Sequence, residues 1–233
     1  MNIAVILAGG IGSRMRTTNN IPKQYLKINN RIIISFCLET FEKDDLTDKI
    51  YIVADKLWRD VIDDCIKSAG ITKFKGYCEP GETRQLSIYN SLKVISETVG
   101  AEDVVIIHDA ARPLVTKDLI DECYKACEEY DGAMPVLPVK DTFYMSSDGT
   151  NISSLLKRSE LFAGQAPESF KFRKYYEVHN KMSVEDIKKI NGSSEIAYIN
   201  GLNVKMISGD ERNFKITTQE DLKNFERILQ END

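Results

Sequence analysis

Short apolar runs, each about as long as a β-strand, recur along the chain and alternate with longer, charged segments. The runs occupy residues 3–7, 50–54, 104–108, 133–136 and 204–207. Between several of them, apolar residues return every three or four positions, clearly within 58–66 and less regularly within 87–95, which is the spacing of an amphipathic helix. This alternation predicts an α/β fold with a mainly parallel sheet and helices on both of its faces.

Two regions interrupt the alternation. Within 138–157, strand-like segments at 141–145 and 152–156 flank the turn-rich residues 146–151, which predicts a protruding β-hairpin arm. The polar residues 191–195 lie between two helical segments and predict a loop. Since no repeat, low-complexity tract or linker divides the chain, we expect a single domain over 1–233.

Length, charge and apolar content limit the class of protein. A chain of 233 residues with 42% hydrophobic content can bury one α/β core. The net charge of −5 argues against a general nucleic-acid-binding or anionic-membrane surface. No 18-residue apolar stretch and no basic leader with a cleavage site are present, so we expect a cytoplasmic protein without a membrane partner.

The five cysteines are odd in number and form no CxxC pair, which favours reduced thiols over disulfides or a zinc site. Cys123 and Cys127 share one face of a predicted helix. We expect both of these side chains to be packing residues.

A glycine-rich segment, LAGGIGSR at 7–14, follows the first apolar run. Gly9, Gly10 and Gly12 would let backbone N–H groups turn toward one cluster of oxygens, as in loops that bind phosphates. Arg14 and Lys23 add two cations that could reach the α-phosphate while the amides hold the β- and γ-phosphates. The dinucleotide and ATPase glycine patterns are absent. The segment therefore predicts a nucleoside-triphosphate site, with an ordinary strand-to-helix turn and surface charges as the alternative.

A second candidate site, HDAARP at 108–113, follows the apolar run at 104–107. It places Asp109 and Arg112 at the carboxyl end of a predicted central strand, where open α/β sheets bind ligands. The Asp109 carboxylate suits Mg²⁺, and Arg112 could orient it. A purely structural ion pair is the alternative. We expect His108 to be a packed residue rather than a base.

The segment PGETRQLS at 80–87 lies between a strand-like segment and a helix. It offers backbone amides and the cation Arg84 near the same sheet edge, where a base could be read. The alternative is that Thr83 or Ser87 simply begins the helix.

Six motifs together resemble the cytidylyltransferases that act on polyol phosphates. In chain order they are LAGGIGSRM, PKQY at 22–25, GETRQLS, HDAARP, VKDT at 139–142 and NFKITT at 213–218. The resemblance spans nearly the whole chain and includes a ribitol-5-phosphate branch and a 2-C-methyl-D-erythritol 4-phosphate branch. It implies a Rossmann-like α/β fold and a homodimer in which the arm at 138–157 embraces the second subunit.

The resemblance also implies roles for individual residues. The nucleotide set is Leu7, Ala8, Gly9, Gly10, Gly12, Gly81, Glu82, Arg84 and Ser87. The catalytic cations are Arg14, Lys23 and Lys215. The acceptor set is Asp109, Arg112, Thr142 and Arg158, with Asp109 also binding Mg²⁺ and the arm residues acting in the partner's site. The acceptor's phosphate would attack the α-phosphorus of CTP in line and release pyrophosphate, so that no covalent enzyme intermediate is required.

The branch is indicated by two segments. LAGG at 7–10 and GQAP at 164–167 are more similar to the ribitol-phosphate branch, which predicts CDP-ribitol synthesis for teichoic-acid or capsule-type polymers. HDAARP suits both branches, and the family's acidic Thr-Asp-Asp/Glu loop is replaced by residues 192–195, where only Glu195 is a carboxylate. The methylerythritol enzyme of isoprenoid synthesis, or an enzyme for glycerol phosphate or another alditol phosphate, is the alternative.

Two functions outside this reaction are rivals. A CTP-binding module without transfer chemistry would not need both Arg14 and Lys23. A sugar-1-phosphate nucleotidyltransferase that uses UTP or GTP would share a glycine-rich opening, but its longer loop usually differs from residues 9–14.

Overall fold

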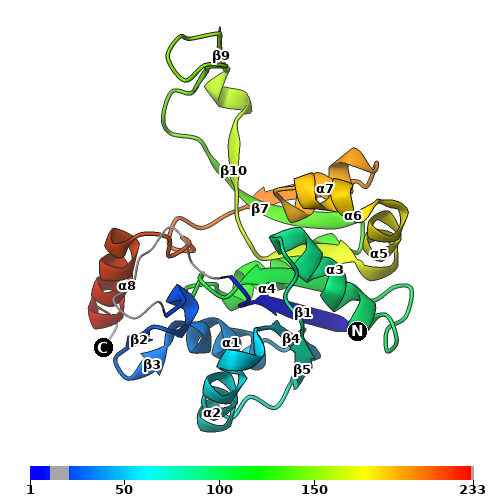
Figure 1. The fold of residues 1–233 in the computed structure, drawn as a ribbon, viewed down its shortest axis with the longest axis vertical. Helices are drawn as coiled ribbons and strands as arrows, with labels where there is room; N and C mark the ends of the chain where they lie inside the picture. Colours follow the sequence, from blue (N-terminus) through cyan, green and yellow to red (C-terminus); the bar gives the residue numbers. More distant parts are fainter. Residues whose placement is uncertain (11–20, 232–233) are drawn as a thin grey trace.

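A central eight-stranded sheet organises the computed structural model, which describes residues 1–10 and 21–231 (Figure 1). Its strands are β1 (Asn2–Leu7), β4 (Lys49–Val53), β5 (Phe74–Cys78), β6 (Val104–Asp109), β7 (Gly132–Pro138), β10 (Phe162–Gly164), β11 (Glu168–Lys171) and β12 (Val204–Ser208). They follow the order β10-β7-β11-β6-β1-β4-β5, with β12 beside β7. β1 runs parallel to β4 and β6, β4 to β5, and β7 to β12, whereas β10 and β11 are antiparallel to their neighbours. The predicted mainly parallel sheet is confirmed.

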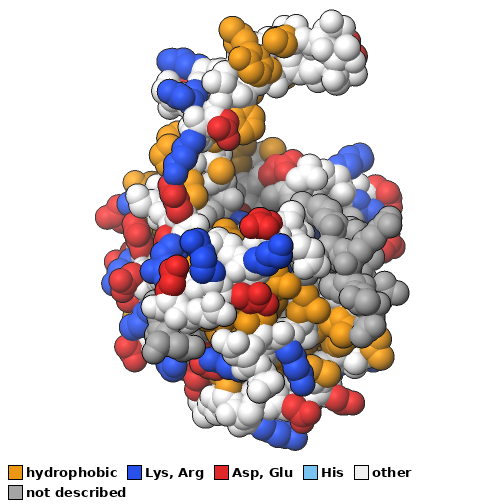
Figure 2. Space-filling model, turned by 90° about the vertical axis from the view of Figure 1, so that its left-hand side faces the viewer, with side chains coloured by type: hydrophobic (Ala, Val, Ile, Leu, Met, Phe, Trp, Pro, Cys, Tyr) orange, Lys and Arg blue, Asp and Glu red, His pale blue; other side chains and the backbone are white. Residues whose placement is uncertain are grey.

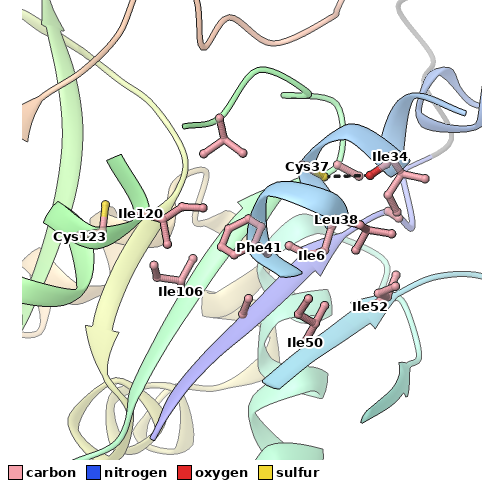
Figure 3. Packing of buried hydrophobic residues seen from close by; sticks show 14 of the residues in the cluster. Ile6, Ile34, Cys37, Leu38, Phe41, Ile50, Ile52, Ile106, Ile120 and Cys123 are labelled. Atoms are coloured by element: carbon pink, nitrogen blue, oxygen red, sulfur yellow. Dashed lines mark hydrogen bonds between the residues drawn. The ribbon is translucent and has the colours of Figure 1, made fainter. Parts of the chain in front are cut away.

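One face of the sheet is covered by α1 (Ile33–Lys43), α2 (Arg59–Ala69) and α4 (Lys117–Ala126). Figure 3 shows Phe41 and Leu38 of α1 and Ile120 of α4 packed against isoleucines of β1, β4 and β6. Each such side chain, when fully buried, contributes about 1.5–3 kcal/mol. The helix predicted around 58–66 is therefore present as α2, with its apolar stripe on the sheet.

The opposite face is covered by α3 (Arg84–Ile95), α5 (Phe172–Lys181), α6 (Val184–Lys189) and α7 (Ser193–Ile199). β1 directs Ile3 and Val5 toward this face and Ala4 and Ile6 toward the other, so the strand is apolar on both sides. This is the pattern of a strand buried within a parallel sheet. A smaller third cluster joins α8 (Gln219–Glu231) to the short ladder of β2 (Lys27–Ile28) and β3 (Arg31–Ile32) through Phe225 and Ile28.

The prediction of a loop over 191–195 is wrong from Ser193 onward, where α7 begins. The Glu195 carboxylate accepts hydrogen bonds from the backbone N–H groups of Asn191 and Gly192, at 2.9 and 3.1 Å. Ile196 and Ala197 then bury themselves against the sheet. A good N-terminal cap and two buried apolar residues outweigh the polar composition of the segment.

The segment between β7 and β10 projects away from the sheet (Figure 1). It contains an antiparallel pair, β8 (Tyr144–Met145) with β9 (Ser154–Leu155), and η3 (Arg158–Glu160). Asp148 holds the turn by accepting N–H bonds from Thr150 and Asn151, both at 2.8 Å. The exposed apolar side chains of this segment and of the adjoining first residue of β10 are Phe143, Tyr144, Met145, Ile152, Leu155 and Phe162. Figure 2 shows hydrophobic side chains gathered on this projection, which we call the arm.

All five cysteines are buried and free, and Cys123 and Cys127 pack in the same cluster as α1 and α4. Burial raises the pKa of Cys127 to about 11. The prediction that these two thiols pack in the core is confirmed. No helix in the described part of the chain is both long and apolar enough to cross a membrane.

Both histidines of the sequence are buried, and burial lowers the pKa of His108 and of His179 to about 4. His108 lies against Phe41, with Nε2 3.0 Å from the Arg112 carbonyl oxygen, as expected for a packed residue. Because an unfolded histidine titrates near 6.5, the unfolded chain binds more protons below that pH. We therefore expect the two histidines to add no pH dependence to the free energy of unfolding above about pH 7, and each to lower it by about 2 kcal/mol between pH 7 and pH 5.

Urea unfolding at pH 7 and pH 5 measures this loss. His179→Gln should remove about half of it. An unfolding free energy that is equal at the two pH values would contradict the prediction.

Candidate active site

Four parallel strands end in register at one edge of the sheet. Leu7 at the end of β1 pairs with Val53 of β4 and with Asp109 of β6, and Val53 pairs with Cys78 of β5. The loops that follow these strands therefore begin side by side. Three of the predicted motifs meet at this edge, where α/β sheets bind ligands: the one at 7–14 through its described residues 7–10, and those at 80–87 and 108–113.

The described part of the glycine-rich loop is held by side chains of η1 (Lys23–Tyr25). Gln24 Nε2 donates to the carbonyl oxygens of Ala8 and Gly10, at 2.6 and 2.8 Å, and the Tyr25 hydroxyl donates to Ala8 at 2.8 Å. A Cβ on Gly9 would lie 2.7 Å from Pro80 Cβ, so only glycine fits there. The loop is thus fixed between η1 and the segment after β5. Gly12 and Arg14 lie outside the described residues.

Lys23 begins η1 directly beside the residues that hold the glycine loop. Its charge also acts on Asp221 in the first turn of α8. Burial alone would raise the pKa of Asp221, but the N–H groups of Thr217 and Thr218 and the charge of Lys23 lower it. Lys23 therefore adjoins in sequence the residue Gln24 that holds the glycine loop, and its charge reaches the first turn of α8.

Asp109, which is buried, is the centre of a group of partly buried cations. Its carboxylate lies 2.9 Å from Lys215 Nζ, 3.3 Å from Arg84 Nε and 3.8 Å from Arg112 Nε. Burial alone would raise the pKa of Asp109, but the charges of Arg84 and Lys215 hold it well below its usual range. Three cations predicted from three separate motifs thus surround one ionised carboxylate.

The segment that carries Lys215 runs along the loop after β6. Ile216 N–H donates to the Ala111 carbonyl oxygen at 2.8 Å, and Arg112 Nη1 donates to the Asn213 carbonyl oxygen at 2.6 Å. These bonds explain how residues more than 100 positions apart in the sequence reach the same carboxylate.

Arg84 makes further contacts that the sequence did not predict. Its Nη1 donates to Ser193 Oγ at 2.6 Å, and its Nη2 lies 3.3 Å from Glu168 Oε1. The altered loop at 192–195 was the signal that could have indicated Ser193. No sequence signal indicated Glu168, because the strand that it begins has only four residues and shows no clear pattern.

The segment 80–87 is shaped by its own hydrogen bonds. Thr83 caps α3 by accepting the Leu86 N–H at 3.2 Å, so the alternative in which Thr83 begins the helix describes this residue. Ser87 Oγ accepts the Gly81 N–H at 2.9 Å and donates to the Thr83 carbonyl oxygen at 2.9 Å. Glu82 is exposed and pairs with Lys188 at 2.8 Å. The nucleotide-binding roles of Gly81, Glu82 and Ser87 stay predictions.

Thr142 and Arg158 lie on the arm and are exposed. Arg158 Nη1 donates to the Lys140 carbonyl oxygen at 3.3 Å, within the arm itself. Since the arm projects from the sheet, these residues are not part of the charge group around Asp109 (Figure 1). Their action in a partner's site stays a prediction.

In residues 1–10 and 21–231, no three His, Cys, Asp or Glu side chains gather into a metal-binding group. Mg²⁺ usually takes one or two carboxylates together with phosphate oxygens and waters. Both oxygens of Asp109 pair with cations, Oδ1 with Arg84 and Oδ2 with Lys215 and Arg112. The Mg²⁺-binding role of Asp109 stays a prediction.

Comparison with known proteins places this chain in a family. The family model described as 2-C-methyl-D-erythritol 4-phosphate cytidylyltransferase matches residues 2–231. A ribitol-5-phosphate cytidylyltransferase of Vibrio parahaemolyticus serotype O3:K6 is 32% identical, covering 98% of this chain and 96% of its own. A 2-C-methyl-D-erythritol 4-phosphate cytidylyltransferase of Clostridium tetani is 36% identical, covering 95% of this chain and 87% of its own.

The fold is similar to that of a solved structure from Anaerococcus prevotii, a 4-diphosphocytidyl-2C-methyl-D-erythritol synthase. The TM-score is 0.81 at 22% identity, covering 98% of this chain and 96% of that one. The resemblance stated from the six motifs is therefore confirmed. The chain belongs to the 2-C-methyl-D-erythritol 4-phosphate cytidylyltransferase family, whose members are CTP-dependent nucleotidyltransferases.

Proposed function

We propose that the protein transfers CMP from CTP to D-ribitol 5-phosphate, giving CDP-ribitol and pyrophosphate. The observation that carries this proposal is the group of Lys215, Arg84 and Arg112 around Asp109, at the sheet edge where the glycine loop begins. Ribitol phosphate is favoured by the LAGG opening and by GQAP at 164–167, and ribitol-5-phosphate enzymes are among the relatives.

In this reaction the acceptor's phosphate is itself the nucleophile, so the chain needs no general base. Asp109 stays ionised at neutral pH and orients Lys215 and Arg112 rather than transferring a proton. These cations would bring the anionic acceptor to the α-phosphate, and Lys23 would neutralise charge that develops on its oxygens. Bound Mg²⁺ would add charge neutralisation at the same phosphates.

The methylerythritol acceptor is the second candidate, because relatives with that activity are 33–36% identical to this chain. Glycerol phosphate and other alditol phosphates are the remaining candidate acceptors. CDP-ribitol would serve teichoic-acid or capsule-type polymer synthesis in the cytoplasm, whereas the methylerythritol product would serve isoprenoid synthesis.

The test is pyrophosphate release from purified protein with CTP, Mg²⁺ and each polyol phosphate in turn. We expect the highest kcat/KM with D-ribitol 5-phosphate and little turnover when UTP replaces CTP. A higher kcat/KM with 2-C-methyl-D-erythritol 4-phosphate would assign the protein to the methylerythritol branch instead. Negligible turnover with all of the acceptors would contradict the transferase proposal.

We also propose that the arm joins two copies of the chain, with Thr142 and Arg158 completing the partner's acceptor site. Six large apolar side chains on the arm are exposed, among them Phe143 and Leu155. Exposed apolar surface of this kind favours burial against a second protein surface.

The double variant Phe143→Asp/Leu155→Asp should convert the dimer to a monomer and abolish most of its activity. Burial of each side chain contributes about 1.5–3 kcal/mol in each subunit, so the dissociation constant should rise by about 10⁴-fold or more. Sedimentation velocity measures the change. Leu57→Asp, at an equally exposed position outside the arm, is the control and should stay dimeric.

A further inference from the structure

A second carboxylate, Glu168, lies beside the Asp109 group and has no role in the reaction described above. It begins β11 and pairs with Ile107 of β6, two residues before Asp109. Since paired residues of neighbouring strands share a face, and residues two apart along a strand do so too, Glu168 and Asp109 lie on the same face at the same edge. Glu168 is only 6% exposed.

Both oxygens of Glu168 accept hydrogen bonds from donors of other elements. Oε2 accepts the backbone N–H of Ser194 at 2.8 Å and its hydroxyl at 2.7 Å, and Oε1 lies 3.3 Å from Arg84 Nη2. An ionised carboxylate only accepts hydrogen bonds, so its two oxygens can serve the Arg84 guanidinium and the Ser194 donors at the same time. A glutamine of the same shape would turn its NH₂ group toward either the Arg84 guanidinium or the Ser194 N–H, and one contact would be lost.

Arg84 is held at three points as a result. Its Nε reaches Asp109 Oδ1, its Nη1 donates to Ser193 Oγ, and its Nη2 reaches Glu168. Behind it, the Tyr175 hydroxyl donates to the Ser193 carbonyl oxygen at 3.2 Å, which anchors the start of α7 on α5. The orientation of Asp109 Oδ1 therefore depends on a chain of contacts that runs through Arg84 to Glu168.

We propose that Glu168 is a positioning residue that determines which polyol phosphate the enzyme accepts. This inference rests on the proposed function. It acts through Arg84, which orients the Asp109 carboxylate toward the acceptor. Of the residues predicted to bind CTP, Arg84 contacts Glu168, whereas Gly81 and Ser87 bond within their own segment. Because Arg84 also contacts Asp109 and Ser193, on the side predicted for the acceptor, loss of the Glu168 charge should act more strongly on the acceptor than on CTP.

The test compares Glu168→Gln with wild type in steady-state kinetics on D-ribitol 5-phosphate and 2-C-methyl-D-erythritol 4-phosphate. We expect the KM for the preferred acceptor to rise about 10-fold and the preference between the two acceptors to shrink several-fold, with the KM for CTP changed less than twofold, as for loss of substrate-positioning contacts. Ser194→Ala removes only one of the three donors and should give a smaller effect of the same kind. Glu129→Gln, at an exposed position, is the matched control.

Three results would overturn the inference: an unchanged acceptor KM, equal changes in the KM for CTP and for the acceptor, or an unchanged preference between acceptors. Ser194→Ala keeps the inference testable if Glu168→Gln does not fold. Wild-type protein that uses no polyol phosphate would overturn the proposed function together with this inference. Active wild type with an unaffected Glu168→Gln variant would overturn the inference alone.

Discussion

Asp109→Asn should lower kcat by about 10²- to 10³-fold, the largest effect of any single substitution that we expect in this protein. The size follows from losses of one preorganised electrostatic group in other active sites. Asp109 is the shared partner of Lys215, Arg84 and Arg112, and its carboxylate fixes where their charges lie. An asparagine keeps the shape but removes the charge, so the three cations repel one another without compensation.

The same substitution should destabilise the fold by about 3 kcal/mol, because it leaves buried charges without their partner. Affinity for CTP should not fall, since the site becomes more positive toward a triphosphate. Single-turnover kinetics, nucleotide titration and urea unfolding separate these effects. Asp64→Asn, at an exposed position on α2, is the control. A kcat within threefold of wild type would show that Asp109 is a structural ion-pair residue only, which was the alternative weighed from the sequence.

Lys23→Ala should lower kcat by about 10²-fold with little change in thermal stability, by analogy with the loss of one charge-stabilising donor. The described part of the glycine loop accepts hydrogen bonds from Gln24 and Tyr25, so these bonds should persist in the variant. The variant therefore removes the Lys23 charge while it keeps these bonds.

Lys27→Ala is the matched control, because Lys27 is exposed on the neighbouring strand β2. Pyrophosphate release under saturating CTP measures kcat, and thermal unfolding checks the fold. Near-normal turnover by Lys23→Ala would remove this lysine from the mechanism and strengthen the rival in which the loop only binds nucleotide.

The central strands and the helices on them were predictable because their signals are local. β1, β4 and β6 are continuous apolar runs, and α2 repeats its apolar residues with helical spacing, so each pattern is visible within a dozen residues. β11 was missed, since Glu168–Lys171 has only one apolar residue, Phe170, and its strand conformation comes from pairing with β6 and β7. α7 was missed for a similar reason, as its cap and its buried contacts override its polar composition.

By itself the sequence determined the α/β class, the carboxyl-edge location of the site and the residue types that converge there, because strand ends and glycine turns are encoded by neighbouring residues. Only the tertiary structure decided which of those residues meet. Lys215 lies 106 positions from Asp109, and Glu168 lies 84 positions from Arg84, so no local pattern relates them. Their contacts arise from strand register and from the packing of α3, α5 and α7 on one face, where buried charges are stable only when each has a partner.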